Sequence, residues 1–182
     1  MASKNTKNAV EGDLLILTEL MKHLKIPVLE RQNFIKVVKW GGLAIETWLE
    51  QAITKVSKIK RSNKNGEDFV NGWEAKKCTV VYHSHGKCIK NVNREANVSN
   101  LHTKHGDVLI VAADPLSTEL FYFKVPSHEI QGRKTITITF NTNGGELTKF
   151  VARNGSVENT FSWRLWNLYR KKSFRELCKI ED

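Results

Sequence analysis

The chain has 182 residues, 40% of them hydrophobic and 26% charged, which suits one domain with a hydrophobic core. Its formal net charge of +10 at pH 7 favours a polyanionic partner such as nucleic acid. No apolar run approaches the roughly 18 to 20 residues of a membrane span, and the polar, basic residues 1–8 argue against a secretory signal. Three cysteines, an odd number, argue against a disulfide framework and favour a cytoplasmic location.

The first part of the chain has the pattern of helices. Asp13 is a candidate N-cap for a helix whose apolar residues recur at helical spacing up to Leu24, and Pro27 ends that helix. A second, short helix is expected over residues 30–39. A pair of glycines separates it from a third helix, whose apolar stripe covers residues 45–56.

Charged residues accompany the third helix. Glu46 borders the apolar stripe, one turn from Leu49 and two turns from Ile53, which is the usual place of a boundary residue with its carboxylate in water. The basic run after the helix either complements the helix dipole in solvent or contacts phosphate groups. It consists of Lys55, Lys58, Lys60, Arg61 and Lys64, of which the last four are predicted to bind DNA.

Residues 67–76 carry the strongest pattern for a site. The Asn-Gly pair within this stretch predicts a β-hairpin, because both residue types tolerate positive φ. Glu74 and Lys76 are two apart on the return strand, so their side chains share one face, and an acid of the preceding strand joins them. Carboxylates beside an ammonium group favour a hard cation such as Mg²⁺, and the lysine would orient or activate an attacking water.

The length of the hairpin loop decides which acid joins this pair. A strict two-residue turn pairs Val70 with Trp73, which places Glu67 opposite Lys76 and turns Asp68 away. A three-residue loop, or a bulge near Asp68, brings Asp68 to the same face instead. Simple register therefore favours Glu67, and a longer loop favours Asp68.

These residues also carry a resemblance to a known family. Asp68, five residues, then Glu74-Ala75-Lys76 resembles the PD-(D/E)xK nuclease motif, with Glu67 at the place of the proline. The resemblance extends upstream to residues 39–49. Over residues 36–82 the chain is similar to the active-site region of the MutH-type mismatch-repair nickases and of their type II restriction endonuclease relatives.

The resemblance implies a set of roles. Asp68, with Glu67 as the alternate, and Glu74 would hold one or two Mg²⁺ ions, for which Mn²⁺ would substitute. Glu46 is a candidate further ligand, and Lys76 would position or activate the water. Cleavage would leave 5′-phosphate ends.

After the motif, a strand is expected to continue to Tyr82, followed by a long polar excursion over residues 83–105 with a short helix near residues 93–99. Polar side chains of this excursion are predicted to face DNA. The alternative is structural zinc, although the spacing fits no standard finger. The predicted DNA contacts are His83, His85, Lys87, Lys90, Arg94 and Lys104, and the zinc candidates are Cys78, His83, His85, Cys88, His102 and His105.

The rest of the chain predicts strands and a final helix. Residues 107–113 are apolar on both faces and predict a central strand, with residues 120–125 as its partner. Residues 134–140 alternate threonine with apolar side chains, and residues 147–152 are expected to pair back on them. The threonine face is either a solvent face or a surface for the DNA groove. Residues 160–180 predict a helix packed on the core with a basic outer side.

Together these patterns predict a mixed α/β fold with a helical N-terminal segment and a central β-sheet of about five strands flanked by helices, and the resemblance implies that this sheet is mixed and restriction-endonuclease-like. One endonuclease domain is expected over residues 1–182, with the core motif region at about 36–126 and a β-hairpin and basic aromatic segment over 127–182. The predicted function is Mg²⁺-dependent cleavage of double-stranded DNA by a type II restriction enzyme, acting as a homodimer. A strand-nicking repair endonuclease and a non-catalytic DNA-binding module are the alternatives.

Overall fold

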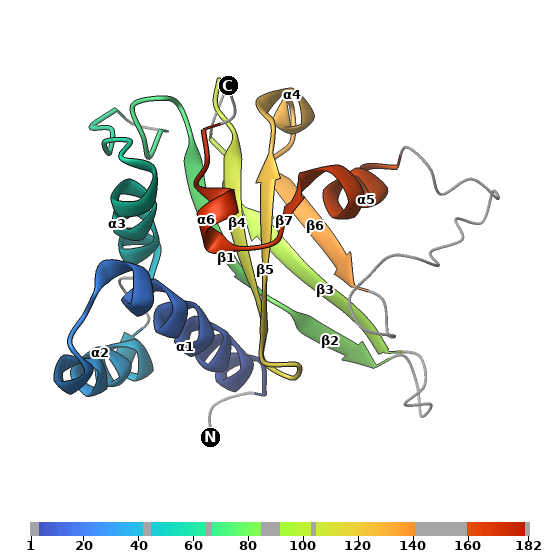
Figure 1. Ribbon diagram of the computed structural model, residues 1–182. Helices are drawn as coiled ribbons and strands as arrows, with labels where there is room; N and C mark the ends of the chain where they lie inside the picture. Colours follow the sequence, from blue (N-terminus) through green and yellow to red (C-terminus); the bar gives the residue numbers. More distant parts are fainter. Residues whose placement is uncertain are drawn as a thin grey trace.

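The computed structural model describes residues 4–41, 45–64, 67–84, 92–102, 105–140 and 160–180 (Figure 1). Three helices come first: α1 (Lys4–Leu24), α2 (Val28–Gly41) and α3 (Ile45–Ser57). The predicted helical N-terminal segment is therefore confirmed. No helix in these described ranges has both the length and the apolar composition needed to cross a membrane.

The expected start of the first helix was wrong. Helix α1 begins at Lys4, so Asp13 lies within the helix and is not its N-cap. The Asp13 side chain is buried, and its Oδ1 atom accepts a hydrogen bond from Lys77 Nζ at 2.6 Å. Asp13 therefore stabilises the contact between α1 and the sheet, because a buried carboxylate needs a charged partner.

Two sheets follow the helices. The four-stranded sheet has the order β1-β4-β5-β7, and it is mixed because β1 pairs parallel to β4 while the other pairs are antiparallel. The three-stranded sheet has the antiparallel order β2-β3-β6. The strands are β1 (Glu74–Thr79), β2 (Val81–Ser84), β3 (Val92–Ser99), β4 (Val108–Asp114), β5 (Glu119–Val125), β6 (Thr135–Phe140) and β7 (Arg170–Lys171).

The mixed α/β class is thus confirmed, with the strands divided between two sheets in place of one sheet of about five strands. The strand expected to continue from β1 to Tyr82 changes sheets after Val80, whose N–H donates to Ala113 O at 2.8 Å. Residues 93–99, expected as a helix, form most of strand β3, which is paired on both sides. The expected return strand over 147–152 lies outside the described residues.

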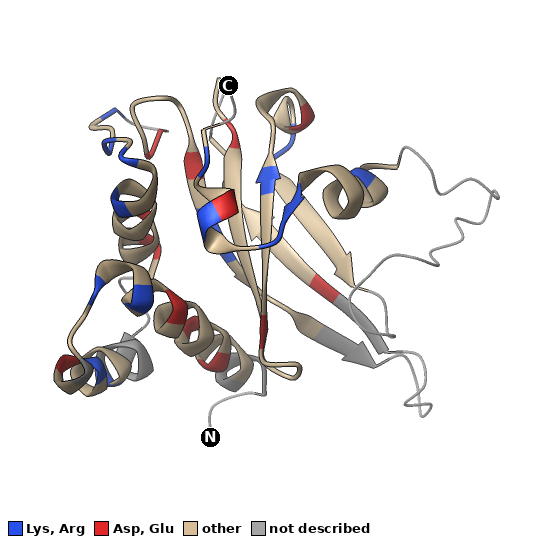
Figure 2. Cartoon of the chain, in the orientation of Figure 1, with Lys and Arg blue, Asp and Glu red and all other residues tan. Residues whose placement is uncertain are grey.

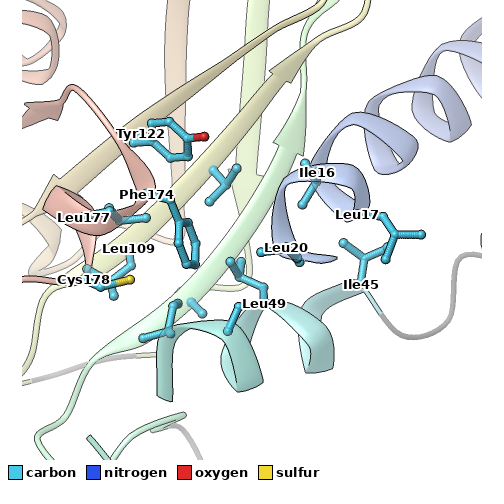
Figure 3. Close-up of a cluster of buried hydrophobic side chains, with 14 of the residues drawn as sticks. Ile16, Leu17, Leu20, Ile45, Leu49, Leu109, Tyr122, Phe174, Leu177 and Cys178 are labelled. Carbon is cyan, nitrogen blue, oxygen red and sulfur yellow. The ribbon is translucent and has the colours of Figure 1, made fainter. Parts of the chain in front are cut away.

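The four-stranded sheet has a hydrophobic layer on each face, and all seven residues of β4 are buried between them, as expected for a central strand. One face packs against α1, α3 and the C-terminal helix α6 (Phe174–Leu177) (Figure 3). The other face contributes Ile110 and Phe123 to a cluster with Val98 and Ile138 of the second sheet. The candidate site described below lies where β1 forms one edge of this layered core.

The C-terminal segment differs from the single helix expected over residues 160–180. It consists of α5 (Phe161–Arg164), the π-helical turn η1 (Leu165–Tyr169), strand β7 and helix α6; a further short helix, α4 (Ser127–Ile130), precedes β6. Thr160 and Ser173 cap α5 and α6, since their hydroxyl groups accept from the N–H of Trp163 and Glu176. Two short helices, each with its own N-cap residue, therefore replace one continuous helix.

Candidate active site

The loop before β1 has three residues. The N–H groups of Asp68 and Phe69 both donate to Trp73 O at 3.2 Å, and Gly72 N donates to Phe69 O at 2.9 Å. Gly72 has φ +82, the left-handed conformation that closes such a loop with a bulge, whereas Asn71 does not have a positive φ. The two-residue turn that would have favoured Glu67 is therefore not formed.

This loop directs Asp68 to the open edge of β1. Its Oδ2 atom accepts a hydrogen bond from Ala75 N at 2.7 Å. Strand β1 pairs only with β4 within the four-stranded sheet, so the Ala75 N–H belongs to the edge that β4 leaves uncovered. Glu67 instead donates its backbone N–H to Lys64 O at 3.4 Å in the preceding turn.

Glu74 and Lys76 meet on one side of β1, as their spacing predicts. Lys76 Nζ lies 2.9 Å from Glu74 Oε1, with side-chain exposures of 15% for Lys76 and 3% for Glu74. The other carboxylate oxygen of Glu74, Oε2, accepts from His102 N at 2.9 Å. Burial of this carboxylate is offset by the ammonium group and by the backbone donor, while Lys76 keeps access to solvent.

The first turns of α3 bring two more carboxylates toward Asp68. Glu46 and Glu50 are four residues apart and share one face of the helix. Burial raises the pKa of Asp68, and the charges of Glu74 and Glu46 raise it further. The hydrogen bond from Ala75 N and the charge of Lys76 lower this pKa, but by less. Burial also raises the pKa of Glu50, and the charges of Asp68 and Glu46 add to it. These acids therefore form one electrostatically coupled group beside Lys76.

Two parts of the site, the acid Glu50 and the backbone N–H of His102, had not been predicted from the sequence. Glu50 was not singled out, although its position one turn after Glu46 was a signal that the same helix face continues there. Glu50 also forms an ion pair with Arg61, which was predicted to contact DNA. The backbone N–H of His102 that supports Glu74 had no signal in the sequence, because the contact spans 28 positions.

Two glycines allow the loop to sit close to its neighbour. A Cβ atom at Gly106 would lie 2.0 Å from Gly72 O, so the two backbones touch where a side chain has no room. Trp73, next to Glu74, is buried, and Lys124 Nζ lies over its ring in a cation–π contact, 4.5 Å from the ring centroid. These contacts fix the loop that carries Asp68 against the start of β1.

The donor set suits Mg²⁺ by type and charge. Asp68 and Glu74 supply hard carboxylate oxygens, and the pKa of Asp68 is raised by burial first and then by the charges of Glu74 and Glu46, so a bound cation would favour its ionised form. In the described ranges, Asp68 Oδ1 receives no hydrogen bond, and Glu46 is exposed without an ion pair. Within the same ranges, no three His, Cys, Asp or Glu side chains already converge as a metal-holding group. Glu46 is thus a candidate third ligand that is near the pair but not assembled with it.

The predicted DNA contacts fall into two sets. Lys58, Lys60 and Lys64 are exposed on the segment between α3 and the loop, where Figure 2 shows several basic residues. Arg61 is about half exposed and paired with Glu50. The remaining side chains lie outside the described part of the chain; they are His83, His85, Lys87, Lys90, Arg94 and Lys104.

The zinc alternative loses one of its candidates. Cys78 lies in β1 and is buried in the core, and burial raises the pKa of its thiol to about 12. A zinc ligand must be a thiolate, so this cysteine does not suit the metal. The side chains of His83, His85 and Cys88 are outside the described residues.

Comparison of the chain with protein-family models, with curated proteins and with solved structures gives no match. The functional interpretation therefore depends on the geometry of this site and on the sequence motif that predicted it.

Proposed function

We propose that the chain is a Mg²⁺-dependent endonuclease that hydrolyses double-stranded DNA, in the manner of a type II restriction enzyme. The observation that carries the proposal is that Asp68 is held at the open edge of β1 by the N–H of Ala75, the residue between the paired Glu74 and Lys76. The acids and the lysine belong to the PD-(D/E)xK-like motif, and the charges of Glu74 and Lys76 both act on the pKa of Asp68, after the larger effect of burial.

Each side chain has a role that its surroundings support. Asp68 and Glu74 would hold Mg²⁺, which would stabilise the charge that develops on the phosphate during attack. Glu46 would complete the ligand set from α3. Lys76, held by Glu74 at 2.9 Å, would direct the attacking water through Nζ. The water oxygen forms a bond to phosphorus as the bond to O3′ breaks, which leaves a 5′-phosphate and a 3′-hydroxyl.

The charge and surface of the chain are consistent with DNA as the substrate. The net charge of +10 favours a polyanion, and Lys58, Lys60 and Lys64 are exposed on the segment that leads to the site. A homodimer would match the two strands of a symmetric site. We place the enzyme in the cytoplasm, where Cys78 and Cys178, which are free and buried, would stay reduced.

The test is incubation of supercoiled plasmid with the protein, with and without Mg²⁺. Discrete linear fragments would support a restriction enzyme, and open circles would support the nickase. No change with any plasmid would leave only a DNA-binding module. Lys76→Ala and Glu74→Gln should abolish cleavage while duplex binding in EDTA is retained.

Lys77→Ala is the matched control for these variants. Lys77 is adjacent in sequence but pairs with Asp13 of α1, away from the proposed site. The Lys77→Ala variant should therefore cleave like the wild type at a temperature where circular dichroism shows it to be folded, although the loss of its ion pair lowers its stability. Full activity of Lys76→Ala would remove the assignment.

A further inference from the structure

A second charged site lies away from the candidate active site. A hollow of about 560 Å³ opens between the C-terminal ends of α1 and α3 and the segment around α6. Among the described residues that line it, none is an aspartate or a glutamate. Its cations are Lys22, Lys25, Lys55, Lys58, Arg175 and Lys179. We call this hollow the basic pocket; a cavity of this volume is in the range of small-molecule sites.

The basic pocket and the proposed metal ligands lie on different sides of α3. Lys55 follows Glu46 by nine residues, which is about two and a half helical turns and therefore half a rotation about the axis. The pocket is thus not an extension of the acidic site. In Figure 2 basic residues mark both the end of α1 and helix α6, which face this region.

The charge of the pocket is only partly compensated. Glu19 pairs with Lys22 at 2.8 Å and contacts His23 at 3.0 Å. Within the described ranges, the side chains of Lys25, Lys55 and Arg175 have no ion pair. The ends of α1 and α3 each add about half a negative charge. Within the described part of the chain, Glu19 and these helix ends offset about two of the six formal charges, so helix capping alone does not account for the cluster.

The pocket is built on packed elements. Helices α1, α3 and α6 all contribute to one hydrophobic cluster, and Cys178 at the pocket is buried in it. The ring of His23, which also lines the pocket, lies 4.6 Å from that of Phe174. The packed helices therefore hold the backbone positions of these cations around one hollow, which favours a binding site over a charged surface without fixed shape.

We propose that the basic pocket binds phosphate groups. Several lysines and an arginine around one hollow suit the repeated charges of a polyphosphate, with arginine able to donate in a bidentate manner. The phosphates would come either from a DNA backbone beyond the cleavage site or from a free polyphosphate. The DNA source rests on the proposed function, whereas the free source does not.

The test compares a variant that lacks three positive charges in the pocket with a control variant that lacks three positive charges elsewhere on the surface. The pocket variant is Lys25→Gln/Lys55→Gln/Arg175→Gln. The control variant makes the same change in net charge at exposed positions outside the pocket, namely Lys36→Gln/Lys134→Gln/Lys172→Gln. Binding is measured in EDTA, so that its outcome is independent of cleavage: a labelled duplex of about 20 base pairs by fluorescence anisotropy, and inorganic tripolyphosphate by calorimetry.

If the pocket holds a DNA backbone, the pocket variant should lose duplex affinity by up to about eightfold for each lost phosphate contact at about 0.1 M salt. The slope of log affinity against log salt concentration should also become less steep, by roughly two to three released counterions. If the source is free polyphosphate, tripolyphosphate binding should be lost while duplex binding matches the control. Pocket and control variants that bind both probes equally would overturn the proposal.

Single variants keep the test decisive if the triple variant folds poorly. Lys55→Gln and Arg175→Gln each change one exposed side chain, and folding is checked by circular dichroism. Each single variant should show part of the affinity loss of the triple variant. Lys55→Arg, which keeps the positive charge, should bind both probes like the wild type. Single variants that are folded and bind as tightly as the wild type would also refute the pocket.

Discussion

Replacing Gly106 with alanine perturbs the contact that holds the loop before β1, which carries Asp68. The new Cβ atom would lie 2.0 Å from Gly72 O and 2.6 Å from Trp73 N, whereas ordinary contacts begin at 3.4 Å. Both neighbours are backbone atoms, so no side-chain rotation relieves the clash. Gly106 does not itself have a positive φ, so the substitution adds no conformational strain. The loop must therefore move away.

The size of the effect follows from this geometry. The loop has to shift by about 1.4 Å to restore contact, and overpacking of this kind costs about 1 to 3 kcal/mol. For a chain of this length, a cost of about 3 kcal/mol lowers the unfolding temperature by roughly 6 to 12 °C. The N–H groups of Asp68 and Phe69 both bond to Trp73 O, so the shift displaces Asp68. A displacement of about 1 Å should lower cleavage about 100-fold.

Thermal unfolding followed by circular dichroism and plasmid cleavage in Mg²⁺ measure these two effects. Gly132→Ala is the control, because Gly132 has φ +76 but no atom within 4 Å of the new Cβ. It should lose only the conformational cost, about 1 to 2 kcal/mol, and cleave like the wild type. An unfolding temperature for Gly106→Ala equal to that of the wild type, or undiminished cleavage, would refute the proposed packing.

Three further predictions concern the charged groups. Because burial, and then Glu74 and Glu46, raise the pKa of Asp68, its charged form is disfavoured in the folded state. The wild type should therefore lose stability relative to Asp68→Asn as the pH rises above about 4, which urea unfolding at several pH values measures; a constant difference would contradict it. Glu46→Gln should lower the pKa of Asp68 in a carboxyl NMR titration, and an unchanged value would show that Glu46 is too distant. Lys77→Ala should destabilise the fold by about 1 to 3 kcal/mol in urea unfolding, because it leaves the buried carboxylate of its partner in α1 unpaired, and a stable variant would contradict this.

The fold was predictable where local pattern and burial agree. Strand β6 alternates because Ile136, Ile138 and Phe140 are buried while the threonines between them face outward. The sequence of strand β3 has the composition of a polar excursion, and of its described side chains, those of residues 95–99, Ala96 and Val98 belong to the core. Its place is set by pairing with β2 and β6, which local composition does not reveal.

The same contrast applies to the candidate site. The contact between Glu74 and Lys76 follows from the two-residue period of a strand, so spacing alone predicted it. Asp68 depended on the length of one loop, which the sequence left open between two registers. Glu50 joins the group only because α3 packs beside β1, which is a tertiary contact.

The central claim is that Asp68 and Glu74 share a divalent cation. The most direct measurement is Mn²⁺ binding by electron paramagnetic resonance, with Mg²⁺ as competitor, for the wild type, Asp68→Asn and Glu74→Gln. The wild type should bind Mn²⁺, Mg²⁺ should displace the bound Mn²⁺, and each variant should bind Mn²⁺ at least about tenfold more weakly. Equal Mn²⁺ affinity in all three proteins, or no binding by the wild type, would contradict it.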